Sequence, residues 1–397
     1  MQPWLLLHKI LENSGAIKHK TRLMSLMHAV NGVLSGAKLS LTSIGRHMEK
    51  KIKPRSKIQE MNYLLGNGQL NNEKFAVYRT MTKLLCASRT VLYIAIDWST
   101  VVPHELHLLR ASLICKGRSM VLYEEIHPEK KLSNGLVHMK FLERLKSMLP
   151  ANVPVCTITD AGFQTDFFKQ VISIGWNFTG RLLTNMHYTL EGKNEWQPCA
   201  SLYPQANEKA RFIGAVELSK ATRTKANLHL LKKMPKPKSR GKKRKVYYAR
   251  KEKEHRNAAQ KPWLIATSLK NLSIEIMKIY RVRMKIEHDF RDVKDPQWGI
   301  GLRASRCKDL VRLSLLLLIG SLAIFLLWVI GLTIENEKLQ YDFQANSYKH
   351  KRVLSLVFLG LEAIRSGYLQ QITLPDITAL QNSVDYLDES LPVQILC

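Results

Sequence analysis

The sequence predicts a mixed α/β protein with helical regions at both ends, and three observations indicate this class. Two runs, VLYIAIDWS at 91–99 and VPVCTIT at 153–159, are apolar or β-branched almost throughout, as in strands buried on both faces. Amphipathic stretches with helical spacing alternate with such runs. Finally, 45% of the 397 residues are hydrophobic, which suffices for a sizeable core and excludes a disordered basic chain.

The net charge is the strongest feature of the composition. The chain carries 61 Lys and Arg against 32 Asp and Glu, a formal net charge of +29. Such a charge points to a polyanionic partner, with nucleic acid first and an anionic membrane surface second. The six cysteines form no CxxC pair, so we expect no structural zinc site and a reducing compartment.

Residues 1–85 are predicted to form an all-α N-terminal DNA-binding domain. Apolar residues have helical spacing over 22–35, capping residues begin a second helix over 40–51, and a short helix over 57–65 ends at GNG. Short helices with tight turns and many Lys and Arg are typical of helix-turn-helix DNA readers. A generic helical cap is the alternative, and the charge favours DNA binding.

Residues 86–185 are predicted to form the first part of the α/β core. The pattern gives strands at 91–99, 105–115, 118–127, 153–159 and 176–183, with helices at 134–149 and 166–174. KGR at 116–118 is predicted to be a hairpin turn between the second and third strands. The result is a mixed five-stranded sheet with flanking helices, an antiparallel start and parallel additions. This order of elements is the one found in ribonuclease-H-like domains.

Residues 186–262 interrupt the core and are predicted to be a basic, mostly β insertion, with one strand over 211–219. Between Lys220 and Lys261 there are 17 Lys and Arg against two Glu, about half the net charge. Prolines and a glycine within 232–256 argue against a continuous helix. A solvated flexible loop is one interpretation, and direct contact with phosphates is favoured.

Residues 263–332 are predicted to complete the core, and 333–397 to form a helical C-terminal region with a possible role in dimerisation. The segment Leu313–Leu332 has twenty residues without a charge and is long enough to span a membrane. We favour a core helix, because no other such segment exists in the sequence. The rest of the chain also resembles a soluble enzyme with key residues on both sides of this segment.

Two carboxylates stand where predicted neighbouring strands end. Asp97 ends the first buried strand, and Asp160 follows the fourth. In the ribonuclease-H order these strands are adjacent, so both side chains are expected at one edge of the sheet. A carboxylate there is poorly solvated, and two like charges side by side repel unless a metal ion lies between them.

A long helix is predicted over Ile274–Val293, and it carries a polar stripe. At about 100° per residue, one face holds an aromatic residue, three cations and a carboxylate: Tyr280, Arg283, Glu287, Arg291 and Lys294. The adjacent face is apolar, whereas Asp289 and Asp292 point away. A ladder of salt bridges on a solvated face is the alternative. The apolar neighbours favour a helix docked beside the sheet, with Glu287 at the edge of the buried stripe.

The run Tyr280-x2-Arg283-x3-Glu287-x6-Lys294 matches the Y-R-E-K signature of the insertion-sequence-four family of bacterial DDE transposases at all four positions. IDWS around Asp97 and TDAGF around Asp160 also resemble the first and second acidic motifs of that family. The resemblance covers nearly the whole chain, and within the family it is strongest to the Tn-ten type.

This resemblance implies a ribonuclease-H-like core interrupted by a mostly β insertion between the second Asp and the Glu. It implies that Asp97, Asp160 and Glu287 are the catalytic residues and hold two Mg²⁺ ions, for which Mn²⁺ can substitute. One ion would activate the attacking water or 3′-hydroxyl, and the other would stabilise the leaving oxygen.

The resemblance also implies contacts with DNA. Phosphates of the transposon end would be bound by four side chains of the predicted long helix: Tyr280, Arg283, Arg291 and Lys294. Family enzymes release the element through a DNA hairpin, for which a base leaves the stack. Trp263 matches the aromatic residue on which that base stacks, and a core tryptophan is an equal alternative. Arg181 aligns with a DNA-contacting Arg of the family.

The expected function is a cut-and-paste transposase that acts as a homodimer on paired terminal inverted repeats. It would cleave the ends by metal-dependent hydrolysis and hairpin formation, and join the 3′ ends to target DNA. We expect it in the bacterial cytoplasm, associated with the nucleoid. A non-catalytic DNA-binding protein on the same fold is one alternative, against which the intact acidic triad argues. A membrane-associated protein that uses Leu313–Leu332 is another, and recovery without detergent would exclude it.

Overall fold

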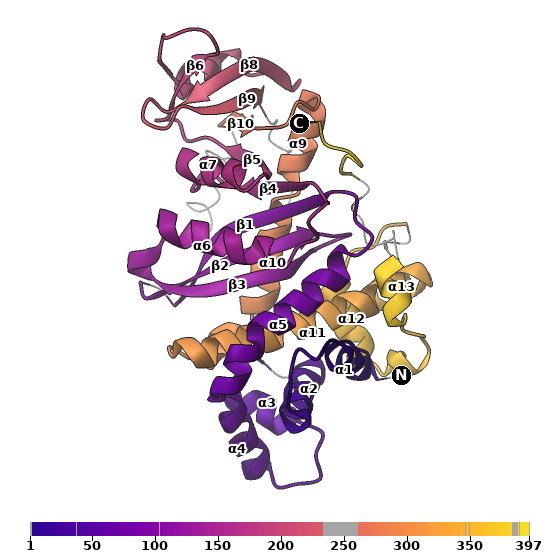
Figure 1. Ribbon diagram of the computed structural model, residues 1–397. Coiled ribbons are helices and arrows are strands. Elements are labelled where there is room, and N and C mark those ends of the chain that lie inside the picture. Colours follow the sequence, from indigo (N-terminus) through magenta and orange to yellow (C-terminus); the bar gives the residue numbers. More distant parts are fainter. Residues whose placement is uncertain are drawn as a thin grey trace, which may run out of the picture.

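The structure is a computed structural model that describes residues 2–36, 38–102, 104–232, 261–345, 347–348, 350–382, 388 and 390–396. Its centre is a ten-stranded sheet with the order β3-β2-β1-β4-β5-β10-β9-β8-β6-β7. Helices lie on both faces, and a layer of helices packs at the β3 end (Figure 1). The mixed α/β class predicted from the sequence is confirmed.

The first five strands are those that the sequence predicts. They are β1 (Leu92–Val102), β2 (Leu106–Ile114), β3 (Ser119–Pro128), β4 (Val155–Thr159) and β5 (Asn177–Arg181). The first three pair antiparallel, whereas β4 pairs parallel to β1 and β5 parallel to β4. Between β2 and β3, Gly117 has a φ of 71°, a backbone conformation that glycine adopts without strain. The hairpin turn predicted at 116–118 is therefore present.

The remaining strands extend the same sheet. They are β6 (His187–Leu190), β7 (Gln197–Pro198), β8 (Arg211–Leu218), β9 (Thr224–Leu231) and β10 (Trp263–Thr267). Strand β10 pairs antiparallel with β5 on one side and with β9 on the other. The predicted five-stranded sheet is therefore one half of a larger sheet, which the strands after β5 continue. Most of the basic stretch predicted to contact phosphates, 233–260, lies outside the described residues.

Helices α6 (Gly135–Lys146) and α7 (Thr165–Ser173) lie on one face of the sheet (Figure 1). The Asn134 side chain caps α6 by accepting hydrogen bonds from the amides of Leu136 and Val137. In α7, Phe168 stacks on Phe178 of β5 with ring centroids 4.3 Å apart. Gly180 makes room for this ring, because a Cβ there would lie 2.5 Å from Phe168 Cζ.

On the opposite face, the predicted long helix is divided into α9 (Ser273–Arg281) and α10 (Met284–Lys294), so the prediction of one continuous helix was wrong. The Arg283 amide donates to the Tyr280 carbonyl, and the Lys285 amide to the Val282 carbonyl. Such bonds between residues three apart tighten the chain into a turn. The helical angles of residues before and after Arg283 therefore do not belong to one regular wheel.

The N-terminal region is helical, as predicted. It comprises α1 (Pro3–Ser14), α2 (Lys20–Leu34), α3 (Leu41–His47), α4 (Pro54–Leu65) and α5 (Gly68–Cys86). Helix α3 ends before the predicted 51, and α4 begins at Pro54 instead of after it. Proline suits this first helical position, because its missing N–H would have no partner there.

Helix α11 (Leu310–Asn336) has 27 residues and contains the uncharged segment Leu313–Leu332. It is long and apolar enough to cross a membrane, yet 94% of its most apolar window is buried inside the protein. It packs against β3 and against helices of both the N-terminal and the C-terminal regions. The indole N–H of Trp328 donates to the Lys116 carbonyl at 3.0 Å. The prediction that this segment forms a core helix is confirmed.

The C-terminal region contains α12 (Leu356–Arg365) and α13 (Ile377–Asn382). Short 3-10 helices lie at Glu129–Lys131, Cys199–Gln205, Leu302–Ser305, Leu339–Phe343 and Tyr368–Gln370. One hydrophobic cluster includes Leu6, Leu92, Val216, Leu264 and Leu356, one residue from each of the five predicted domains. The core thus runs across the predicted boundaries, and the division of the chain into those domains stays a prediction.

Candidate active site

Asp97 and Asp160 lie where β1 and β4 stop pairing. The last parallel pair between these strands joins Ala95 to Ile158. Asp97 and Asp160 each follow two residues later, so both carboxylates are carried to the same edge of the β1–β4 ladder. One detail differs from the prediction: β1 does not end at Asp97 but continues to Val102, still paired with β2.

Glu287 lies in the first turn of α10. It is linked to the same region by an ion pair with Arg283, which lies in the turn before the helix. Arg283 Nη2 lies 2.6 Å from Glu287 Oε1, and Arg283 Nη1 lies 3.5 Å from Asp97 Oδ2. One guanidinium thus links the first and third predicted catalytic carboxylates. The Glu287 side chain is 43% exposed, against 12% for Asp97.

The electrostatics of Asp97 depend on both of the other carboxylates. Burial and the charge of Asp160 raise the pKa of Asp97 to about 7. The charge of Arg283 and a hydrogen bond of 2.8 Å from the Trp98 amide oppose this rise, whereas Glu287 adds to it. Asp97 therefore feels both of the other carboxylates and lacks enough positive charge to stay fully ionised at neutral pH.

The donor set fits a hard divalent cation, because it consists of carboxylate oxygens around a buried acid that repels its neighbours. Asp97, Asp160 and Glu287 are the side chains that could hold such an ion. They are not assembled into a finished site: among the described residues, no three His, Cys, Asp or Glu side chains form a group that could hold a metal ion. Glu287 instead pairs with Arg283.

An aromatic and cationic group lies beside the carboxylates. The rings of Trp263 and Tyr280 meet edge to face, with centroids 5.0 Å apart and planes at 79°. Burial raises the pKa of Tyr280, the charges of Arg283 and Arg181 lower it, and that of Asp160 raises it. Arg181 ends β5 and pairs in register with Ile265 of β10. The structure thus brings Arg181, Trp263 and Tyr280 together with the acidic residues.

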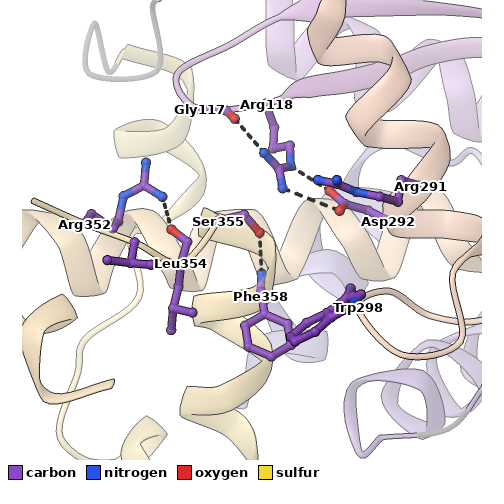
Figure 2. Close-up of a pocket in the computed structure, with 10 residues that line it drawn as sticks. Gly117, Arg118, Arg291, Asp292, Trp298, Arg352, Leu354, Ser355 and Phe358 are labelled. Atoms are coloured by element: carbon purple, nitrogen blue, oxygen red, sulfur yellow. Dashed lines mark hydrogen bonds and ion pairs between the residues drawn. The ribbon is translucent and has the colours of Figure 1, made fainter. Parts of the chain in front are cut away.

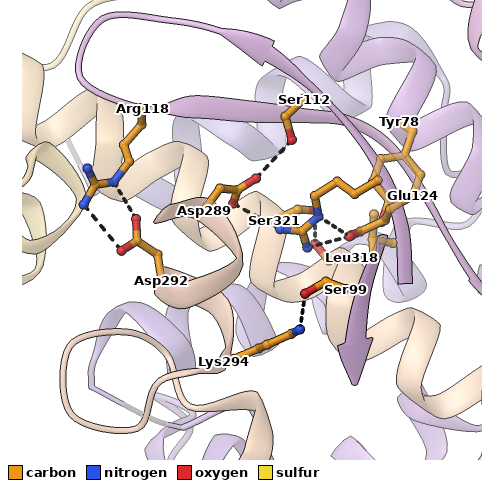
Figure 3. A network of polar contacts seen from close by, with 11 residues as sticks. Tyr78, Ser99, Ser112, Arg118, Glu124, Asp289, Asp292, Lys294, Leu318 and Ser321 are labelled. Atoms are coloured by element: carbon orange, nitrogen blue, oxygen red, sulfur yellow. Dashed lines mark hydrogen bonds and ion pairs between the residues drawn. The ribbon is translucent and has the colours of Figure 1, made fainter. Parts of the chain in front are cut away.

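Lys294 and Arg291 do not lie on one solvated face as the helical wheel predicts. Lys294 is buried, and its Nζ lies 2.5 Å from Ser99 Oγ and 2.6 Å from the Thr100 carbonyl (Figure 3). Burial, helped by the charges of Arg110 and Arg303 and opposed by that of Asp97, lowers its pKa to about 7. Arg291 is exposed and lines a separate pocket. The prediction of one continuous polar stripe was therefore wrong: the turn at Arg283 separates Tyr280 from α10, and within α10 Lys294 is buried against β1 whereas Arg291 is exposed.

A buried network of charges holds α10 against the sheet (Figure 3). Arg110 of β2 lies 2.6 Å from Glu124 of β3 and 3.1 Å from Asp289 of α10. Ser112 donates to Asp289 at 3.0 Å. A second pair joins Arg118 to Asp292 at 2.6 Å. These acids of α10, which the wheel placed away from its packed face, are buried because β2 and the turn before β3 supply arginines.

Sequence reasoning missed this network, although it left a signal. Arg110 lies in the middle of one predicted strand and Glu124 in the middle of the next, and they pair directly in the antiparallel register of β2 and β3. A charge inside a buried strand needs a partner. Opposite charges in neighbouring strands therefore predict an ion pair, but the third member, Asp289, is distant in sequence and could not be found in this way.

The comparison with known families agrees with this geometry. A family model described as "Transposase DDE domain" matches residues 94–326, more than half of the chain. The matched span begins three residues before Asp97 and includes Asp160 and Glu287. No curated protein matches the chain. Transposases of this kind act on DNA and generally use divalent metal ions, for which a set of oxygen ligands is suited. Because this match covers more than half of the chain, the protein belongs to the family of DDE-domain transposases.

Proposed function

We propose that the protein is a cut-and-paste transposase of the insertion-sequence-four family, most similar to the Tn-ten type. It would excise a DNA element by metal-dependent hydrolysis and hairpin formation and join its 3′ ends to target DNA. The observation that carries this proposal is that Arg283 links Asp97 to Glu287 at the edge of the β1–β4 ladder to which Asp160 is also carried.

The three acids would hold two Mg²⁺ ions, with Mn²⁺ able to substitute. When bound, such ions activate the attacking oxygen and stabilise the leaving oxygen of an in-line phosphoryl transfer. The protein's own contribution is electrostatic. A cation would favour the ionised form of Asp97, which burial and Asp160 oppose. The Glu287 side chain is 43% exposed, against 12% for Arg283 and for Asp97, so it can turn from Arg283 toward the other carboxylates.

The group beside the acids is proposed to hold the transposon end. Arg283 and Arg181 would contact phosphates, and Tyr280 would donate a hydrogen bond to one. The Trp263 ring, fixed edge to face on Tyr280, would stack the base that leaves the duplex during hairpin formation. Trp263→Ala should then reduce the hairpin fraction among cleavage products. Unchanged hairpin formation would leave Trp263 as a core residue only.

Lys294 and Arg291 of α10, the two further cations, occupy different environments. Lys294 is proposed to act on DNA phosphates from its buried position at β1, where its proton is weakly held. Arg291 is proposed to contact a phosphate from the pocket that it lines. Arg291→Gln should therefore weaken DNA binding. Replacing Lys294 should weaken it too, and should also disturb the packing of α10 against β1.

Recognition of the inverted repeats is proposed to use the N-terminal helices. Helices α3 and α4 pack closely, since a Cβ at Gly45 would lie 2.7 Å from the Ile58 Cα. This close pair, together with the net charge of +29, supports a helix-turn-helix reader. We propose that the protein pairs two ends as a homodimer and works in the bacterial cytoplasm at the nucleoid.

The test uses a plasmid that carries the DNA flanking this reading frame. Wild-type protein should cleave it in the presence of Mg²⁺ and not in EDTA. Asp97→Ala should abolish cleavage and keep binding of the same DNA. If the wild type binds DNA but never makes a metal-dependent nick, the second candidate, a non-catalytic DNA-binding protein on this fold, is correct instead.

A further inference from the structure

A pocket of about 500 Å³ lies between α10, the loop after it and the start of α12 (Figure 2). Its lining shares no residue with the carboxylate group. The side chains that matter for its chemistry are three arginines and two aromatic residues: Arg118, Arg291, Arg352, Trp298 and Phe358. Its volume is within the range of small-ligand sites.

The pocket carries an excess of positive charge. Two arginines are held by carboxylates: Arg118 Nε lies 2.6 Å from Asp292, and Arg352 Nε lies 2.6 Å from Glu335. Arg291 is exposed and forms no ion pair within the part of the chain that the structure describes. Its guanidinium is therefore available to an anion.

The start of α12 adds to the positive potential of the pocket. The ten-residue helix begins at Leu356, and the Ser355 side chain caps it by accepting from the Phe358 amide at 3.2 Å (Figure 2). The first turn of a helix carries partial positive charge, which favours phosphate. Ser355 and Phe358 both line the pocket, so the helix begins at its wall.

An exposed tryptophan forms another wall. Trp298 is 54% exposed, and its ring packs on Phe358 with centroids 5.6 Å apart. The loop that presents it is fixed. The Asp295 carboxylate accepts from the Trp298 amide at 2.8 Å, and a Cβ at Gly299 would lie 2.0 Å from the Asp292 carbonyl. A large ring held in place and half exposed beside an unpaired arginine is the arrangement on which nucleic-acid bases stack.

We propose that this pocket binds one nucleotide of an unpaired DNA strand, with its phosphate on Arg291 and its base against Trp298. Arg291 follows Glu287 by four residues on α10, which is a rise of about 6 Å along the helix. The pocket would thus hold the strand close to the acids as it leaves or enters them. This inference rests on the proposed function only in having DNA as the ligand, and it does not depend on cleavage.

The test is a binding experiment in EDTA, where no cleavage occurs. The probe is a fluorescein-labelled single-stranded 20-mer, compared with the duplex of the same sequence. Trp298→Ala and Arg291→Gln should each weaken single-strand binding about ten-fold, in line with the contribution of one stacked base, and duplex binding much less. Arg291→Gln should also lower the slope of log K against log salt by about 0.7, the value for one phosphate contact on a single strand.

Two matched variants serve as controls. Trp298→Phe keeps an aromatic ring and should bind nearly as the wild type does. Arg365→Gln removes an exposed cation at the far end of α12, where it pairs with Glu362, and should change nothing. Circular dichroism melting confirms that each variant folds.

Several results would overturn the inference. The inference is wrong if Trp298→Ala and Arg291→Gln both bind the single strand as tightly as the wild type does. It is also wrong if each variant loses as much affinity for the duplex as for the single strand, because equal losses indicate general electrostatic attraction. Competition by an acidic peptide as effective as by oligonucleotide would assign the pocket to a protein segment. Free dAMP that displaces the probe as well as a strand does would make it a mononucleotide site. Mg²⁺-dependent cleavage by the wild type is measured separately, so failure of this inference leaves the proposed chemistry intact.

Discussion

The Arg110 guanidinium lies 3.1 Å from the Asp289 carboxylate, and both side chains are almost completely buried. Arg110 sits on β2 directly opposite Asp97 of β1, and Asp289 is two residues beyond Glu287 on α10. This ion pair therefore joins the strand beside the first acid to the helix that carries the third. We infer that it sets the distance between Asp97 and Glu287.

Breaking this pair should cost stability. Arg110→Ala would leave Glu124 and Asp289 as buried charges without their partner, which costs about 3–5 kcal/mol in comparable cases. Urea denaturation at pH 7.5 checks the value. The exposed pair of Arg365 and Glu362 is the control, and Arg365→Ala should cost less than about 1 kcal/mol. Equal costs for the two variants would show that the buried network is not a major support of the fold.

Asp289→Asn separates positioning from stability. The amide keeps the shape of the side chain and can still bond to Ser112, but it removes the charge that faces Arg110. We expect a lower cleavage rate with DNA binding close to that of the wild type. A variant that cleaves at the wild-type rate would mean that the ion pair has no part in placing Glu287.

Neutralising Asp97 should stabilise the metal-free protein at alkaline pH. Its pKa is raised to about 7 in the folded state, so the folded protein holds this proton more tightly than the unfolded chain. The contribution that the protonated Asp97 makes to stability is fully present below about pH 4 and is lost as the pH rises through 7. Asp97→Asn should thus unfold at a higher temperature than the wild type at pH 8 in EDTA, and show little difference at pH 4. The gain in the free energy of unfolding should not exceed about 4 kcal/mol.

The same melting experiment tests metal binding. Adding Mg²⁺ at pH 8 should raise the melting temperature of the wild type, because an ion that binds only the folded state stabilises it. Asp97→Asn should not respond. Equal responses of the two proteins would place the ion away from Asp97.

The contribution of Lys294 to the free energy of unfolding should change with pH in the opposite direction. Burial lowers its pKa to about 7, whereas the unfolded chain keeps the proton up to about pH 10.5. The unfolded state thus binds more protons between these values, and this residue adds stability as the pH rises from 7 toward 10.5. Lys294→Met should lose that rise, which urea denaturation at pH 7 and pH 9.5 detects. A parallel pH profile in the wild type and the variant would contradict a buried, weakly protonated lysine.

Much of the fold follows from local patterns. Strands β1 to β5, helices α6 and α7 and the core helix α11 are predicted within a few residues, because apolar runs and helical spacing report burial directly. The turn at Arg283 escapes prediction, since no proline or glycine marks it and its hydrogen bonds depend on how α9 and α10 dock. The continuation of the sheet through β10 also depends on pairing between distant segments.

The candidate active site could also be predicted only in part. Asp97 and Asp160 follow apolar strands, which predicts their common edge. Glu287 is suggested by its spacing from Tyr280 and Arg283, which the resemblance to a family makes specific. The burial of Lys294 against β1 and the exposure of Arg291 could not be predicted, because a helical wheel says nothing of the partners that other segments supply.

Cleavage by a single variant tests the central claim most directly. Glu287→Gln is compared with Glu362→Gln, which removes a carboxylate from the surface of α12. Both are assayed with Mg²⁺ on DNA that flanks this reading frame. We predict that Glu287→Gln binds the DNA but makes no cut, while Glu362→Gln cuts as the wild type does. Cleavage by Glu287→Gln at the wild-type rate would contradict a catalytic site built from Asp97, Asp160 and Glu287.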